Sequence, residues 1–106
     1  SVRQISAGSL YLYDREYNTE ISKLNTERKK FADKKDDKHA ASELKRIDDR
    51  IKFFKSALSK KVLDAIEKVA KQEKISLVLE KNSGNVLYAD NKFDITYKVL
   101  DLLKRS

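Results

Sequence analysis

Residues 44–69 read LKRIDDRIKFFKSALSKKVLDAIEKV, and the spacing of their apolar side chains decides the fold. These apolar positions recur at steps of three and four residues: Leu44, Ile47, Ile51, Phe54, Leu58, Val62, Ile66 and Val69. Such spacing is typical of a helix that packs lengthwise against another helix. An extra step of four after Leu58 is a stutter, which relaxes a left-handed supercoil. We therefore predict one helix over about residues 40–72, roughly 50 Å long.

A second helical pattern lies upstream of this run. Its apolar positions are also three or four residues apart: Tyr13, Tyr17, Ile21 and Leu24. The pattern predicts a helix over about residues 9–34, with Ser9 as its N-cap. Residues 33–39 (DKKDDKH) contain no apolar side chain and are interpreted as an exposed tip that joins two antiparallel helices. We expect His39 in this tip to be solvated, and the two helices to form an arm.

The pattern changes from helix to strand after residue 72. Residues 75–79 (ISLVL) and 86–89 (VLYA) flank the turn KNSGN, which predicts a β-hairpin with Gly84 free to adopt a positive φ. Residues 2–6 are a further strand candidate, and a last helix is expected to begin after Asp94 as N-cap. Apolar residues lie on both faces of the strands, which indicates burial on both sides and favours an oligomer.

Composition excludes several classes of protein. The chain has 106 residues, no proline, two glycines, no cysteine and one histidine. Sandwiches and barrels need many turns rich in Gly and Pro, so long helices with a small sheet are expected instead. Without Cys there is no disulfide or thiolate metal site, and His39 alone offers little for catalysis. We expect no enzyme activity and no cofactor.

Charge points to an anionic partner. Charged residues make up 39% of the chain and the net charge is +7, which suggests an acidic protein, a membrane surface or nucleic acid. We do not expect nucleic acid binding, because the sequence has no recognition motif. The sequence shows neither a transmembrane run nor a signal peptide. It therefore fits a cytoplasmic protein or an exported protein whose signal has been removed.

The C-terminal half contains an ordered series of segments: AIEKVA at 65–70, ISLVL at 75–79, VLYA at 86–89, DIT at 94–96 and Val99-Leu100. This series resembles the Skp/OmpH family. GSLY at 8–11 also resembles the start of the family's first helix. The arm between these regions matches only in type, and no single motif is diagnostic.

The resemblance implies a fold, an assembly and a function. The expected fold is α+β and a single domain over residues 1–106. Residues 1–12 and 60–106 would form a small β-sheet body with a C-terminal helix, which builds a Skp-like homotrimer. Residues 13–59 would be the protruding coiled-coil arm. Family members are ATP-independent holdase chaperones of the periplasm, and they use no ATP or metal. They hold unfolded outer-membrane β-barrel proteins in a cavity enclosed by three arms.

One departure leaves an alternative open. The arm of this chain is about half the length usual in the family, so the chain is a natural short-armed member or one whose arm has been shortened. A trimeric structural or assembly module, with arms too short for full chaperone activity, is the alternative function. For either function we expect residence in the periplasm after removal of a signal peptide.

Candidate contact residues follow from exposure and charge. For client binding these are Phe53, Tyr13, Lys29, Lys30, Lys34 and Lys35. Phe54 lies on the apolar seam and is expected in the core, whereas Phe53 is rotated from it by about 100°. Arm or trimer packing is the alternative for both Phe53 and Tyr13. The lysines could instead contact an anionic membrane surface or lipopolysaccharide, or act only in solubility.

A second group of candidates is expected to pack the body and the trimer: Leu77, Val78, Leu79, Val86, Tyr88, Ile95 and Val99. The acidic pairs 36–37 and 48–49 lie in no glycine-bearing calcium loop. They are interpreted as solvated residues of the tip and the helix.

Overall fold

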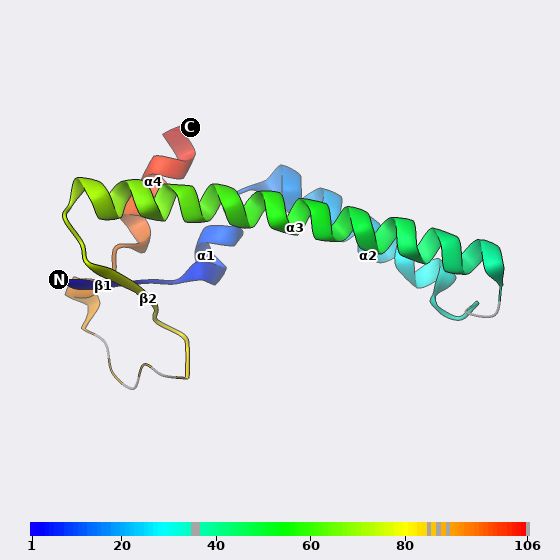
Figure 1. Cartoon of the computed structure of the whole chain (residues 1–106), viewed down its shortest axis with the longest axis horizontal. Helices are drawn as coiled ribbons and strands as arrows, with labels where there is room; N and C mark the ends of the chain where they lie inside the picture. The colour runs from blue at the N-terminus through cyan, green and yellow to red at the C-terminus, as the bar shows by residue number, and fades with distance from the viewer. Residues whose placement is uncertain (35–36, 85, 87, 89, 106) are drawn as a thin grey trace. The chain divides into compact units, whose positions relative to one another are not determined.

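The computed structural model of the chain describes residues 1–34, 37–84, 86, 88 and 90–105. Long helices and a small two-stranded sheet make up the fold, as the sequence predicts (Figure 1). In chain order the elements are β1 (Val2–Ile5), α1 (Ala7–Tyr11), α2 (Arg15–Ala32), α3 (Lys38–Gln72), β2 (Leu77–Glu80), the 3₁₀ helix η1 (Asn91–Phe93) and α4 (Thr96–Arg105). They fall into two compact units, one of residues 14–58 and the other of residues 1–13 and 59–106.

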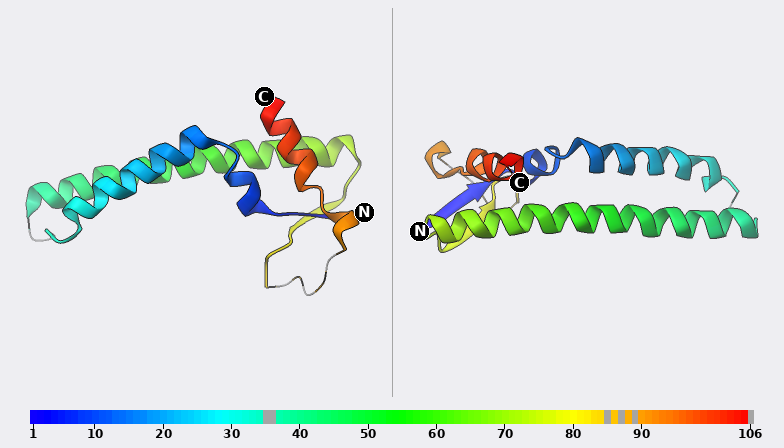
Figure 2. Two further views of the ribbon diagram at one scale, coloured as in Figure 1. Left: turned by 180° about the vertical axis from the view of Figure 1, so that it is seen from behind. Right: turned by 90° about the horizontal axis from the view of Figure 1, so that it is seen from above.

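The unit of residues 14–58 is a helical hairpin. Helix α2 runs antiparallel to the first part of α3, which Figure 2 shows side by side in both views. The apolar seam predicted for the second helix supplies the core of this unit, because Ile47, Ile51 and Leu58 are buried. Tyr17 of α2 meets the ring of Phe54 edge-on, with 5.8 Å between the centroids.

The first predicted helix is wrong in one respect. It was expected to run unbroken over residues 9–34, but α1 ends at Tyr11 and α2 begins at Arg15. The cause is Asp14, whose side chain accepts a hydrogen bond from the backbone N–H of Tyr17 at 3.1 Å and so caps α2. A short acidic side chain that bonds the backbone locally favours a helix start over a helix interior. The N-cap of α1 is Ser6, so Ser9 is not the cap.

The other unit has a core shared by its strands and helices. Its buried residues are Ile5, Leu10, Val62, Ala65, Val69, Ile95, Val99 and Leu103. They come from β1, α1, the last part of α3 and α4, with Ile95 directly before α4. Helix α1 contacts α4, and the carboxylate of Glu80 accepts a hydrogen bond from the backbone N–H of Ala7 at 2.8 Å. Strand β2 is thereby tied to the start of α1.

The predicted β-hairpin is also wrong. Strand β2 pairs in parallel with β1, in a register that joins Val2 to Leu77 and Ile5 to Glu80. Val86 and Tyr88 lie in no strand, and Leu87 and Ala89 fall outside the described residues. The two paired strands are brought together by the long connection through the helices, which local sequence patterns do not reveal. The edge of β1 away from β2 makes a bridge between Gln4 and Asp94.

The left-handed backbone position lies elsewhere than expected. Gly84 does not have a positive φ, whereas Lys74 does, at 56°. Lys74 follows α3, and the N–H of Ile75 donates to the carbonyl of Ala70 at 2.9 Å. This is the pattern of a helix ended by a left-handed residue, a position that glycine usually occupies.

Candidate functional site

An exposed aromatic ring stands on α3 in the hairpin unit. Phe53 is 59% exposed, and its ring lies edge-on to Phe54 with 5.6 Å between centroids. The guanidinium of Arg50 lies over both rings, 5.6 Å from the centroid of Phe53 and 4.9 Å from that of Phe54. Cation–π contact holds the arginine against the rings. Arg50 is not among the candidates predicted from the sequence, although its i,i+3 spacing to Phe53 is the signal that could have found it.

The charges around Phe53 differ from those nearer the hairpin tip. Residues 50–58 contain three cations, Arg50, Lys52 and Lys55, and no Asp or Glu. Within the part of the chain that the structure describes, these three form no ion pair. The segment therefore exposes an aromatic side chain among three cations that form no ion pairs with described acidic residues.

Nearer the tip, cations are paired across the two helices. Arg28 binds Asp48 at 2.7 Å, and a hydrogen bond and the charge of this carboxylate raise the pKa of the guanidinium. Arg46 binds Glu27 at 2.7 Å and Glu43 at 2.9 Å. Hydrogen bonds from its guanidinium, first to Glu43 and then to Glu27, raise its pKa. These pairs are solvent-exposed and contribute little to stability, but they leave less free charge for an anionic partner.

The predicted lysines lie at the end of α2 and after it. Lys29, Lys30 and Lys34 are exposed, and none forms an ion pair with another described residue. Lys29 and Lys30 occupy the last turn of α2, where positive charge suits the helix dipole. Lys35 lies outside the described residues, as does Asp36.

Tyr13 occupies a different kind of position from Phe53. It is half-buried and packs against the core of the unit of residues 1–13 and 59–106. It lines a small groove with Lys61, Asp64 and Lys68. The structure therefore places Tyr13 and Phe53 in separate units.

The candidates for body packing divide into two sets. Ile95 and Val99 are buried in the core, and Val78 packs against it. Val86 is half-buried. Leu77, Leu79 and Tyr88 are exposed instead, and Val2 and Phe93 join them.

The exposed set gathers on one face of the sheet. Because Val2 pairs with Leu77 in register, and Leu79 follows Leu77 by two residues, these three side chains share a face. Val2, Tyr88 and Phe93 also line one groove. Exposed apolar side chains that lie together in this way are typical of an interface.

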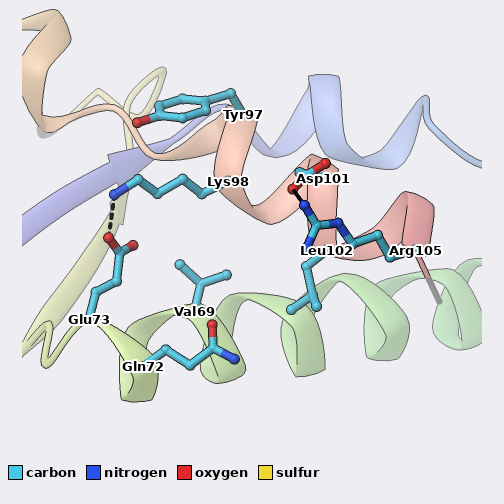
Figure 3. A pocket seen from close by; sticks show the side chains of 8 residues that line it. All are labelled: Val69, Gln72, Glu73, Tyr97, Lys98, Asp101, Leu102 and Arg105. Carbon is cyan, nitrogen blue, oxygen red and sulfur yellow. Dashed lines mark hydrogen bonds and ion pairs between the residues drawn. The ribbon is translucent and has the colours of Figure 1, made fainter.

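A larger groove lies between the end of α3 and α4 (Figure 3). It holds about 610 Å³, and Val69 and Leu102 are its apolar side chains. The charged groups in it are paired with one another: Lys98 binds Glu73, and Arg105 binds Asp101 at 2.8 Å. The hydrogen bond to Glu73 raises the pKa of Lys98. With these charges satisfied, the groove offers little to an ionic ligand.

Asp94 joins the segment after β2 to α4. Its carboxylate binds Lys81 at 2.9 Å and accepts a hydrogen bond from the backbone N–H of Thr96, also at 2.9 Å. Burial by itself raises the pKa of this carboxyl. The hydrogen bonds from Lys81 and from the hydroxyl and N–H of Thr96 outweigh burial and lower the pKa below its ordinary value. Asp94 therefore has a structural role at the start of α4, close to the N-cap role that the sequence predicts for it.

The described residues include no cluster of three or more His, Cys, Asp or Glu placed to hold a metal ion. Among the helices in this part of the chain, none is long and apolar enough to cross a membrane.

These features define an α+β protein with a long helical hairpin, an exposed aromatic ring among cations and an exposed apolar face on its sheet. A family model described as outer membrane protein (OmpH-like) matches residues 12–103, and the chain belongs to this family. The match confirms the resemblance to the Skp/OmpH family in the sequence. The family consists of periplasmic chaperones, not enzymes, that bind unfolded outer-membrane proteins. No curated protein matches the chain.

Proposed function

We propose that this chain is an ATP-independent holdase of the periplasm that binds unfolded outer-membrane proteins as a homotrimer. Family membership supports the chaperone function. The observation that carries the proposal is Phe53, whose ring is 59% exposed on α3 and lies beside the guanidinium of Arg50. Exposed apolar and cationic side chains suit an unfolded client, because they bind without a fixed partner geometry.

Holding without ATP requires contacts that are individually weak. A single exposed phenyl ring contributes little by itself, but three copies in a trimer act together, so that affinity comes from multivalency. The unpaired cations Lys52 and Lys55 would attract acidic clients at long range and speed encounter. Lys29, Lys30, Lys34 and Lys35 are proposed to add to this attraction.

The two units receive different roles in this proposal. The unit of residues 14–58 corresponds to the arm proposed for residues 13–59. The rest of the chain, proposed as the trimerisation body, carries the exposed sheet face of Val2, Leu77 and Leu79. Burial of this face between three copies would supply part of the core that one short chain lacks.

Light scattering tests the holdase proposal. A urea-denatured outer-membrane β-barrel protein is diluted into buffer with increasing amounts of this chain, without ATP, and aggregation is followed. We expect suppression by the wild type. A total loss of about 1 kcal/mol in client binding would shift the half-maximal suppression by Phe53→Ala to about fivefold higher concentration.

Leu63→Ala is the matched control, because Leu63 is also an apolar residue of α3 and is 58% exposed. It lies in the other unit and outside the cationic run around Phe53. Equal losses from both variants would show that general surface hydrophobicity, rather than the Phe53 site, binds the client. No suppression by the wild type at large excess would refute the holdase function.

A trimeric assembly module is the second candidate, and the short arm favours it. Insertion of matched helical turns into α2 and α3 would lengthen the arm without changing the body. Activity that appears only in the lengthened protein would assign the natural chain to the module function. Activity already present in the wild type would favour the holdase.

An anionic membrane surface or lipopolysaccharide is a further proposed partner for the lysines at the end of α2. Co-sedimentation with vesicles containing anionic lipid would test it. Glutamine at Lys29, Lys30 and Lys34 should weaken this binding and make it less sensitive to salt.

A further inference from the structure

Gln4 on β1 has a buried polar atom without a partner. The residue is 9% exposed, and its Oε1 is the buried side-chain polar atom for which the described structure shows no hydrogen bond. Its backbone carbonyl, in contrast, is hydrogen-bonded, because it accepts a hydrogen bond from the N–H of Ile95 at 2.8 Å.

An unpaired amide at this depth calls for an explanation. Buried polar groups are nearly always hydrogen-bonded, because losing water without a replacement costs free energy. Leu or Met could fill the position without that cost. A donor from outside the chain would satisfy the oxygen.

The surroundings of Gln4 show where that donor can enter. Gln4 lines an open groove of about 260 Å³ with Val2, Tyr88, Asp90 and Phe93. Gln4 pairs with Leu79 in the register of the sheet, so it shares a face with the exposed residues Val2, Leu77 and Leu79. The acceptor therefore sits within an exposed apolar surface, which suits a partner that is mainly apolar and carries one donor.

We propose that a second copy of this chain covers this groove and donates a hydrogen bond to Oε1 of Gln4, which fixes the register between copies. The inference rests on the homotrimer of the proposed function. A second copy of the chain carries suitable hydrogen-bond donors for this acceptor. Among the described residues β2 has β1 as its only strand neighbour, so its outer edge carries free N–H donors beside the exposed side chains of Leu77 and Leu79. A single polar group in an apolar interface is a known means of specifying register.

Sedimentation equilibrium tests this role with Gln4→Met, which keeps side-chain volume and removes the acceptor. We expect its association to weaken about tenfold, equivalent to about 1.4 kcal/mol, because the donor of the second copy loses its partner. The single chain, studied at dilution, should be as resistant to urea as wild type or more so. Gln72→Met, the same change at an exposed position of α3, should associate like wild type.

Leu77→Lys gives a second measurement that does not depend on packing around Gln4. Leu77 is 50% exposed, so lysine should leave the single chain folded by circular dichroism and abolish association. Unchanged association of either Gln4→Met or Leu77→Lys would overturn the inference. A monomeric wild type that still suppresses aggregation would overturn it and leave the holdase function standing. If the wild type associates but has no holdase activity, and both variants associate more weakly than the wild type, the inference is supported. Only the proposed function is then refuted.

Discussion

Leu10 and Leu12 provide a matched test of the fold, because the same substitution should have very different effects two residues apart. Leu10 of α1 is 0% exposed in the core, whereas Leu12, just after α1, is 72% exposed. Leu10→Ala removes buried carbon atoms and leaves a cavity, which costs about 2–5 kcal/mol. Leu12→Ala removes carbon atoms that are mostly in water already, so the cost should stay below about 0.7 kcal/mol.

Urea unfolding followed by circular dichroism at 222 nm measures both variants at one protein concentration, since any assembly makes stability depend on concentration. Leu10→Ala should also lower Tm by about 10 °C or more, given about 4–8 °C per kcal/mol for domains of this size. Equal costs for the two variants would refute the placement of α1 in the core. A large cost for Leu12→Ala that disappears on dilution would instead place Leu12 in an interface between copies.

Two further substitutions test the left-handed helix end at Lys74 and the carboxylate of Asp94. Lys74→Gly should raise the free energy of unfolding by about 0.5–1 kcal/mol, because glycine adopts the left-handed conformation at this helix end without steric strain; a lower free energy would contradict the assignment. Asp94→Asn should lower stability at pH 7, because the lowered pKa of Asp94 means that its carboxylate stabilises the folded state. That contribution is complete above the unfolded-state pKa of about 3.9 and is lost as the pH falls through the folded value. Urea titrations from pH 7 to pH 2 should therefore show the two proteins converging in acid, and a constant difference would refute the reasoning.

The long helix was predictable because its cause is local. Burial at Ile47, Ile51 and Leu58 follows from steps of three and four residues, and α3 begins within two residues of the predicted start. The greater exposure of Phe53 than of Phe54 follows from the same rotation of about 100° per residue. Periodicity therefore predicted which of the two rings is exposed, and so one member of the candidate client site.

The pairing of the strands was not predictable, because its cause is non-local. A short run such as residues 77–80 with a turn behind it indicates a hairpin whenever another apolar run follows. The pairing is decided by the return of α3 past β1, together with contacts such as the hydrogen bond that the backbone N–H of Ala7 donates to Glu80. These join residues more than 70 positions apart. No local pattern carries that information.

The same limitation explains why Gln4 went unnoticed. In the segment VRQI at residues 2–5, alternation alone does not say whether Arg3 or Gln4 faces the interior. In the structure Gln4 is buried on the face that carries the exposed leucines of β2, while Ile5 joins the core on the other face. The sheet therefore has its own core on one side and an incomplete surface on the other. Because Oε1 of Gln4 is a hydrogen-bond acceptor buried in this uncovered face, a partner must match the face in shape and also supply a donor. This requirement restricts which chain can cover the face.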